Sequence, residues 1–340
     1  MVKIALDAMG GDYAPQEIVA GGVMAVKELE VEVVLIGRED EIRKELENHD
    51  TSGFPLSVVH TDEVIEMTDH PATAAKTKKR SSMHVGMRLV KNGEADGFVT
   101  MGNSGGALAT ALFVLGRIPG VKRPALATIY PTIKGYTFLL DIGANADCKP
   151  EYLHQFAIMG NIYVRDVLGV KNPRVGIISN GEERGKGNKL VLDTVPLLES
   201  TPDLNFIGNV EGKDVARGVA DVVVMDGFTG NVLLKGSEGI AWMLGKMIEQ
   251  EVKKSPAAIL GALLMKGAMK KVLARTDYKE YGGAPLLGVN GNVIVGHGRS
   301  NRIAVRNAIR VAKSMTERGV IESIGKHSGI IGRTKDEIDD

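Results

Sequence analysis

The feature that most constrains the fold is a repeated alternation of short aliphatic runs with amphipathic segments of helical length. Several runs, such as VEVVLIG at 31–37, are continuous stretches of valine, leucine and isoleucine, which is typical of strands buried on both faces. The alternation predicts an α/β fold, with a mostly parallel sheet covered by helices. We expect strands at 2–7, 31–37, 56–60, 97–101, 126–130, 137–143, 174–179, 206–210 and 222–226, and helices at 15–28, 39–48, 82–91, 107–115, 151–168 and 189–199.

No low-complexity segment, charge block or long linker divides the chain, so residues 1–340 are expected to form one domain with a central cleft. The acidic residues 334–340 are expected to be a frayed end. The 42 basic and 42 acidic side chains balance, which argues against a dedicated nucleic-acid binder. A single cysteine, Cys148, excludes an intrachain disulfide and favours the cytoplasm. No apolar run reaches the roughly 18 residues of a transmembrane helix.

Five of the expected strands end in loops that combine glycine with Asp or Asn. Because ligands bind at the carboxyl ends of the strands in such folds, we expect these loops to form one polar cleft, provided that the sheet is parallel. The five loops are 7–12 (DAMGGD), 102–106 (GNSGG), 141–145 (DIGAN), 180–188 (NGEERGKGN) and 226–231 (DGFTGN).

Glycine turns that precede helices expose backbone N–H groups, which bind phosphate and other anions. In the cleft, Thr229 is expected to cap a helix, and the amides of Asn103 and Asn231 can polarise a carbonyl oxygen. Lys186 and Lys235 could neutralise an anion. The alternative is that each loop is an ordinary turn, since Asp-Gly and Gly-Asn are common turn dipeptides.

The familiar nucleotide and zinc motifs are absent: the first strand is not followed by G-x-G-x-x-G, and neither a P-loop nor H-E-x-x-H occurs. Asp7, Asp12, Asp141 and Asp226 could together hold magnesium, but we favour a role for them in capping helices and orienting backbone N–H groups. We therefore expect neither a metal nor an organic cofactor.

Gly102–Gly106 also fits G-x-S-x-G between a strand and a helix, the position of a hydrolase nucleophile. Asp226 and His297 follow in the order Ser, Asp, His. A serine acyl-thioesterase with Ser104, Asp226 and His297 is therefore the alternative function, although it leaves the other loops unexplained.

Two further segments point to partners. The basic cluster Lys76, Lys78, Lys79 and Arg80 is either a solvated face or a docking site for an anion or an acidic partner. Residues 253–273 place a short apolar run between lysines, and we expect a protruding amphipathic hairpin there. The pattern fits shallow insertion into an anionic membrane and equally a core or dimer-interface helix. A non-catalytic membrane scaffold is the least favoured alternative, since it gives the polar loops no role.

Six long motifs resemble the phosphate acyltransferases of bacterial phospholipid synthesis, the PlsX family. The match runs from residue 4 to about 312, and the motifs follow the family's order: LDAMGGDYAP, GNSGGALATALFVLGRIPGVKRPAL, LDIGANADCKP, FAIMGNIY, MDGFTGNVLLK and YGGAPLLGVNG. Two positions depart from the family pattern: Ser104 stands where threonine is common, and Arg80 where an aspartate usually precedes the Ser-Ser pair.

The resemblance implies transfer of an acyl group from acyl carrier protein to inorganic phosphate, which gives acyl phosphate. A downstream acyl-phosphate-dependent glycerol-3-phosphate acyltransferase would consume that product. It also implies a three-layer α/β/α sandwich similar to isocitrate and isopropylmalate dehydrogenases and phosphotransacetylases, a homodimer, and a cytoplasmic enzyme in peripheral contact with the inner face of the membrane.

For this reaction the protein should hold phosphate, place the thioester beside it and stabilise the oxyanion. Asn103, Asn145 and Asn231 are candidates for the oxyanion and the pantetheine amides, Asp226 for orienting a lysine or accepting a proton, and Asp7 and Asp141 for organising loops. We expect the carrier to dock at Lys76, Lys78, Lys79 and Arg80. The candidate catalytic residues are Asn103, Lys186, Asp226 and Asn231, and the candidate substrate- or phosphate-binding residues are Asp7, Gly10, Gly11, Ser104, Gly105, Asp141, Asn145, Gly187, Thr229, Gly230, Lys235 and His297.

Overall fold

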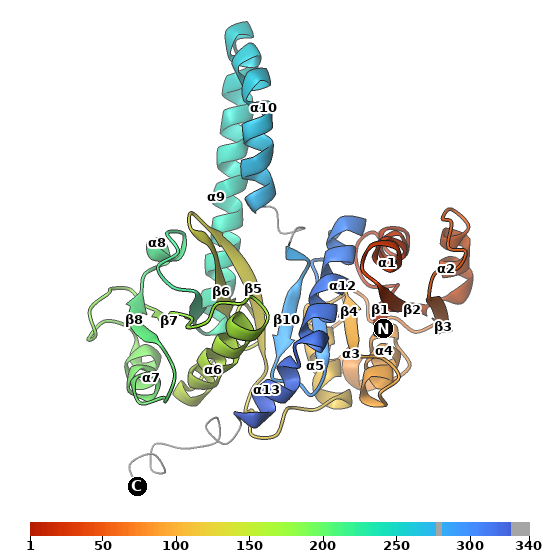
Figure 1. Cartoon of the computed structure of the whole chain (residues 1–340), viewed down its shortest axis with the longest axis horizontal. Coiled ribbons are helices and arrows are strands. Elements are labelled where there is room, and N and C mark those ends of the chain that lie inside the picture. The colour runs from red at the N-terminus through yellow and green to blue at the C-terminus, as the bar shows by residue number, and fades with distance from the viewer. Residues whose placement is uncertain (277–280, 328–340) are drawn as a thin grey trace.

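The computed structural model describes residues 1–276 and 281–327, which form an eleven-stranded sheet with helices on both faces (Figure 1). The strand order is β3-β2-β1-β4-β11-β10-β5-β6-β9-β7-β8. The strands are β1 (Val2–Asp7), β2 (Val31–Gly37), β3 (Leu56–His60), β4 (Gly97–Thr100), β5 (Ala125–Thr132), β6 (Gly135–Leu140), β7 (Val175–Ile178), β8 (Phe206–Val210), β9 (Val222–Val224), β10 (Ala284–Leu287) and β11 (Asn292–Val295).

The helices range from single turns to α9, which is 27 residues long. They are α1 (Gln16–Glu28), α2 (Glu39–Leu46), α3 (Pro71–Thr77), α4 (Ser82–Lys91), α5 (Ser104–Val114), α6 (Pro150–Asp166), α7 (Lys189–Glu199), α8 (Gly212–Val215), α9 (Gly227–Lys253), α10 (Pro256–Thr276), α12 (Arg302–Glu317) and α13 (Val320–Lys326).

The expected fold class is confirmed. Seven pairs of neighbouring strands are parallel and three are antiparallel, so the sheet is mostly parallel. All nine expected strands are present, but β10, β11, α3, α8, α12 and α13 were not predicted. The two missed strands have only four residues each and are flanked by glycines, which makes them hard to distinguish from turns.

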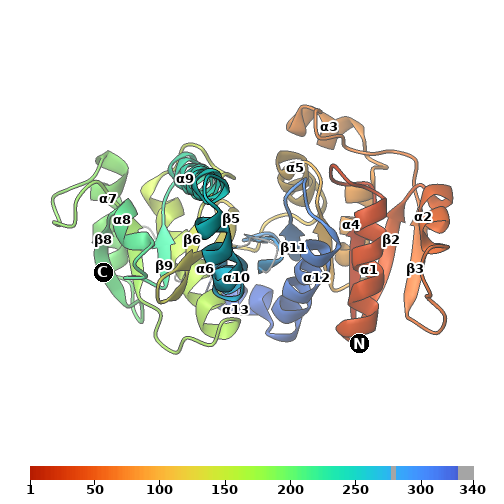
Figure 2. The ribbon, with the colours of Figure 1, turned by 90° about the horizontal axis from the view of Figure 1, so that it is seen from above.

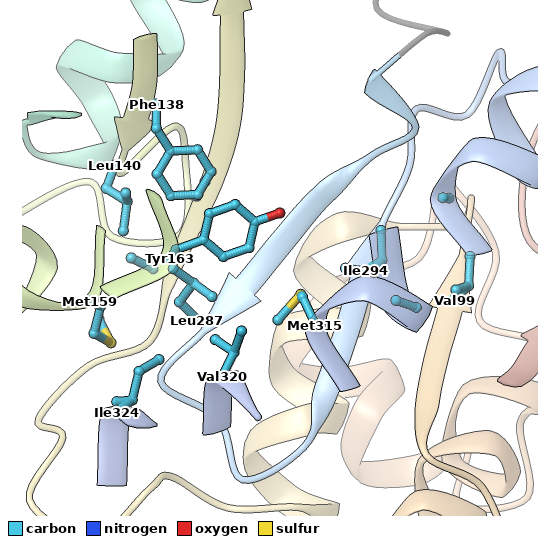
Figure 3. Close-up of a cluster of buried hydrophobic side chains, with 14 of the residues drawn as sticks. Val99, Phe138, Leu140, Met159, Tyr163, Leu287, Ile294, Met315, Val320 and Ile324 are labelled. Carbon is cyan, nitrogen blue, oxygen red and sulfur yellow. The ribbon is translucent and has the colours of Figure 1, made fainter. Parts of the chain in front are cut away.

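The two faces of the sheet differ in how their cores are built. On one face, which carries α1, α12, α13, α6 and α7, a single apolar cluster runs from Val99 and Ile294 through Leu287 to Phe138 and Tyr163 (Figure 3). On the other face the core is divided into one cluster under α4 and α5 and a second under α8 and α9. Figure 2 shows both helices on this face, α5 over β11 and α9 over β6. The two halves of the sheet therefore share a core on one face only.

The parallel-sheet condition for a shared cleft is not met, because the antiparallel strands β10, β5 and β6 reverse the direction of the sheet between its two halves. The loops after β4 and β6 nevertheless reach the same level. Thr100 at the end of β4 pairs with Val295 of β11, and Val295 pairs with Ala284 of β10. Two residues further along β10, Leu286 pairs with Leu126 of β5. Leu140 at the end of β6 pairs with Ala127, the next residue of β5. The strand ends of the two halves therefore face each other across β10 and β5.

Helices α9 and α10 pack against each other and project away from the sheet as a hairpin (Figure 1). The range expected to protrude, 253–273, covers the end of α9, the turn and most of α10, whereas the observed hairpin also includes the part of α9 that follows its contact with β5 at Ser237. Among the described residues, the helices are too short or too polar to cross a membrane. The predicted acidic tail, 334–340, lies outside the described residues.

Candidate active site

The loops after β1 and β4 are joined through the buried carboxylate of Asp7. Thr100 Oγ1 donates to Asp7 Oδ2 at 2.7 Å, the backbone N–H of Met9 donates to Oδ1 at 3.2 Å, and that of Gly102 donates to Thr100 Oγ1 at 3.0 Å. Burial raises the pKa of Asp7, while the hydrogen bonds from Thr100 and Met9 act in the opposite direction. A Cβ on Gly10 would lie 2.6 Å from Asp7 Oδ2. Asp7 and Gly10 thus hold the two loops together.

The loop after β11 completes this side of the cleft. Asp12 donates its N–H to the carbonyl of Gly298 at 2.8 Å. Gly11 has φ +112°, and a Cβ there would lie 3.2 Å from the same carbonyl. His297 is exposed in this loop, and its Nδ1 accepts the N–H of Arg299 at 3.2 Å. Sequence reasoning singled out His297 but missed the strand that positions it; the run NVIVG was the available signal.

Asn103 begins α5, and its side chain is fully engaged within the protein. Its Oδ1 accepts the N–H of Gly106 at 2.9 Å. Its Nδ2 donates to the carbonyls of Glu66, Met67 and Asp69 at 3.1–3.3 Å. This amide therefore caps α5 and fixes the segment before α3, and we revise its expected role from polarising a substrate carbonyl to positioning.

Asp141, at the end of β6, organises the next loop. Its Oδ1 accepts the N–H groups of Leu126, Gly143 and Ala144 at 2.9–3.1 Å. Its Oδ2 accepts the backbone N–H and the Nδ2 of Asn145 at 2.7 and 2.9 Å. Burial raises the pKa of Asp141, and these hydrogen bonds oppose the shift. Since Asn145 Nδ2 also donates to the Pro124 carbonyl at 2.8 Å, we revise its role to positioning as well.

The loop DGFTGN at the start of α9 packs against the loop 141–145. Asp226, not Thr229, caps α9: its carboxylate accepts the backbone N–H of Thr229 at 2.8 Å and the hydroxyl at 3.0 Å. Gly227 donates its N–H to the carbonyl of Asn145 at 2.7 Å. A Cβ on Gly230 would overlap the carbonyl oxygen of Asp141. Both glycines are therefore needed for close contact between backbones.

The two halves of the cleft meet at the start of α5. Ser104 and Gly105 line a small cavity together with Gly143 and Ala144 of the loop after β6. The first backbone N–H groups of α5 have no acceptor within the helix. The positive end of the helix dipole also favours an anion there. The N-terminus of α5 from one half and a glycine loop from the other therefore line part of the same cavity.

The remaining candidates are less central. Asn231 is exposed near the start of α9, and Lys235 pairs with Glu238 of the same helix at 3.3 Å. Lys186 and Gly187 lie after β7; Lys186 is exposed, and its carbonyl accepts Asn209 Nδ2 of β8 at 3.2 Å.

The predicted docking residues lie at the end of α3 and just beyond it. Lys76, Lys79 and Arg80 are exposed, whereas Lys78 Nζ contacts Asp69 Oδ2 at 2.5 Å and the Val64 carbonyl at 2.8 Å. Lys78 is thus part of the framework. Ser81 caps α4, as one of the two expected serines, by accepting the N–H of His84.

The magnesium and hydrolase alternatives depend on side chains that have other partners. Within residues 1–276 and 281–327, there is no cluster of three His, Cys, Asp or Glu residues that could hold a metal ion. Asp226 is engaged by Thr229, and His297 Nδ1 by the backbone of its own loop. The described partners therefore do not assemble Ser104, Asp226 and His297 into a triad.

The fold resembles those of several solved enzymes. A phosphotransacetylase from Staphylococcus aureus is 18% identical and superimposes with a TM-score of 0.61, covering 93% of this chain and 94% of that one. A 4-hydroxythreonine-4-phosphate dehydrogenase from Klebsiella pneumoniae is 14% identical with a TM-score of 0.54, over 93% and 100% of the two chains. The class is thus a three-layer α/β/α protein with the fold of the phosphotransacetylases.

Sequence comparison defines the family. Residues 2–323 match the family model described as "Fatty acid synthesis protein". The chain is 49% identical to a phosphate acyltransferase of Dictyoglomus turgidum, over 95% of this chain and 96% of the relative. It is also 49% identical to one of Desulfitobacterium hafniense, over 96% and 97%. The chain belongs to this family of acyltransferases.

Proposed function

We propose that the chain transfers a fatty acyl group from the thioester of acyl carrier protein to inorganic phosphate, forming acyl phosphate for phospholipid synthesis. The observation that carries the proposal is its near-full-length similarity to enzymes named phosphate acyltransferase. The cleft supports it, since an anion-favouring helix terminus and a glycine loop come together at the edge of one cavity.

The proposed reaction needs no covalent enzyme intermediate. A phosphate oxygen attacks the thioester carbonyl carbon, a C–O bond forms, and the C–S bond breaks as the carrier thiolate leaves and takes up a proton. The protein contributes by holding the two reactants together and stabilising the oxyanion. We assign these contacts to the N–H groups of Ser104 and Gly105, to Asn231 and to His297, with Lys186 as a further cation. Asp7, Asp141 and Asp226 hold the loops in place.

The test is incubation with long-chain acyl carrier protein, with and without phosphate, followed by trapping with hydroxylamine and mass analysis. We expect hydroxamate only when phosphate is present. Ser104→Thr should keep most of the activity. Ser104→Ala removes the hydroxyl and keeps the backbone N–H, so it should lose no more than about 100-fold, the lower end of the effect of removing one oxyanion donor. Free fatty acid without phosphate, together with a loss of about 10⁶-fold in Ser104→Ala, would instead support the serine thioesterase.

We also propose that the carrier docks at Lys76, Lys79 and Arg80. Pro71, the first residue of α3, packs against α5: its Cγ would lie 2.7 Å from a Cβ on Gly105. This contact supports placing the basic side chains beside the entrance to the cleft.

Reversing all three charges to glutamate should raise KM for the acyl carrier about tenfold or more, with little change in kcat, because these charges act in encounter with an acidic partner. The difference from wild type should shrink as salt is added. Lys44→Glu with Lys91→Glu, two exposed residues on α2 and α4, is the matched control. An unchanged KM in the triple variant would remove the docking proposal.

The hairpin is proposed to contact a second copy of the chain and an anionic membrane, making the protein a homodimer that is cytoplasmic and peripheral at the inner face of the membrane. There it would deliver acyl phosphate to an acyl-phosphate-dependent glycerol-3-phosphate acyltransferase. In support, Trp242 is 68% and Leu264 81% exposed, and Lys266, Lys270 and Lys271 flank the apolar surface. Sedimentation without vesicles measures dimer formation, and sedimentation with vesicles of anionic lipid measures membrane binding. A monomer that does not bind the vesicles would contradict both proposals.

A further inference from the structure

Strand β5 lies in the interior of the sheet, yet one of its faces is partly open. Leu126, Thr128 and Tyr130 alternate along the strand, so they share a face, and all three are half-buried. On this face the apolar core is interrupted: Leu126 packs at the margin of the cluster under α5, and Tyr130 at the margin of the cluster under α9. An interior strand normally has both faces covered. The two clusters therefore leave a partly open strip of β5 between α5 and α9.

A cavity of about 40 Å³ lies at the Leu126 end of this strip. Four apolar side chains line it: Leu108 of α5, Leu126 of β5, Leu286 of β10 and Val295 of β11. The rest of its lining is Ser104, Gly105, Gly143 and Ala144, the residues at which the two halves of the candidate site meet. The cavity is therefore continuous with the proposed reaction centre.

The Tyr130 end of the strip is bounded by α9. The hydroxyl of Tyr130 donates to Ser237 Oγ of α9 at 2.9 Å, and Ser237 Oγ donates to the carbonyl of Leu233 at 2.8 Å. From Leu126 to Tyr130 the strand advances four residues, or roughly 13 Å. The open strip thus runs from the cavity to the point where α9 contacts β5.

We propose that the cavity binds the first carbons of the acyl chain and that the rest of the chain continues along the open strip of β5. The inference rests on the proposed function. In that reaction the carbonyl carbon must lie beside the start of α5, and the methylene groups bonded to it must occupy whatever space adjoins that point. Four apolar side chains line the adjoining space, which suits methylene groups and offers little to the amides of a pantetheine arm.

The size of the cavity fits a part of the chain and not the whole of it. Since a water-sized group needs about 10–15 Å³ of such space, the cavity holds about three of them. Leu126 is then a specificity-determining residue, because it lies both in the cavity wall and at the start of the strip.

The test uses binding, so that it does not depend on turnover. Calorimetry compares inorganic phosphate with hexyl phosphate, whose alkyl chain stands in for the first carbons of the acyl group. We expect wild type to bind hexyl phosphate at least tenfold more tightly than phosphate. Leu126→Phe and Leu108→Phe, which fill the cavity from β5 and from α5, should each remove most of that advantage and leave phosphate binding within about threefold. Leu192→Phe, at a 41% exposed position on α7, is the control and should keep the advantage.

The advantage of hexyl phosphate persisting in both cavity variants would overturn the inference, as would an equal loss of both ligands in both variants. Its failure is separable from that of the proposed function. Suppose that wild type makes hydroxamate only with phosphate, and that both variants still bind hexyl phosphate more tightly than phosphate. Only the proposed acyl-chain site is then rejected. Wild type that makes no phosphate-dependent hydroxamate removes the proposed function itself.

Discussion

Gly230→Ala is expected to reduce acyl transfer about 100-fold and to destabilise the fold by about 3 kcal/mol. A Cβ at this position would overlap the carbonyl oxygen of Asp141 and would lie 2.9 Å from the carbonyl carbon of the same residue and 3.1 Å from Ile142 Cα. All of these are backbone atoms, so no side chain can move aside. The start of α9 must shift away from the loop after β6, which stretches the 2.7 Å hydrogen bond from Gly227 to Asn145.

Urea unfolding and the hydroxamate assay measure the two effects. Gly236→Ala is the matched control, because Gly236 lies on the same helix and a Cβ there would meet nothing within 4 Å. That change should be neutral or stabilising by up to about 1 kcal/mol, since alanine is the better helix former. Wild-type stability and rate in Gly230→Ala would show that the two loops are not held in the described contact.

Asp141→Asn is expected to destabilise the fold by about 3 kcal/mol even though it removes a buried charge. Burial alone raises the pKa of Asp141, so a neutral side chain would be favoured if desolvation were the only factor. The carboxylate, however, accepts five hydrogen bonds, two of them from Asn145. An amide keeps one oxygen acceptor and turns its NH₂ group toward donors that then have no partner.

Urea unfolding of Asp141→Asn is compared with Asp147→Asn, an exposed aspartate in the same loop whose change should cost less than about 0.5 kcal/mol. We also expect Asp141→Asn to lose acyl transfer, because the loop faces Ser104 across the cavity. A stable, fully active variant would mean that the five hydrogen bonds do not organise the loop.

Most of the fold could be predicted from local sequence, because long aliphatic runs such as VEVVLIG show their burial directly. The four-residue strands β10 and β11 could not, since a run that short is set by its neighbours in the sheet rather than by its own periodicity. The direction of the strands was equally out of reach. Glycine loops indicate where a strand ends, but they do not show that β10, β5 and β6 reverse the sheet between its halves.

The site was predictable at the level of loops and not of individual atoms. Asn103 and Asn145 looked like free amides because their acceptors are carbonyls more than 20 positions away in the sequence, at Asp69 and Pro124. Phosphate binding by the glycines of DGFTGN stays a prediction, but the crowding around them could not be seen in the sequence. Their crowding comes from the Asp141–Asn145 loop, about 85 residues earlier, and only the assembled structure reveals it.

The position of β11 has a consequence for how the protein is made. Among residues 1–276 and 281–327 it is the last strand, yet it lies between β4 and β10 in the middle of the sheet. Its residue Asn292 pairs with Gly97 of β4. Almost 200 further residues must therefore be synthesised before β4 can pair with β11. Until Val295 has left the ribosome, β4 presents an unpaired edge. A nascent chain that stops short of β11 would carry two incomplete half-sheets with exposed edges, which makes the final stage of translation the period of greatest risk of aggregation.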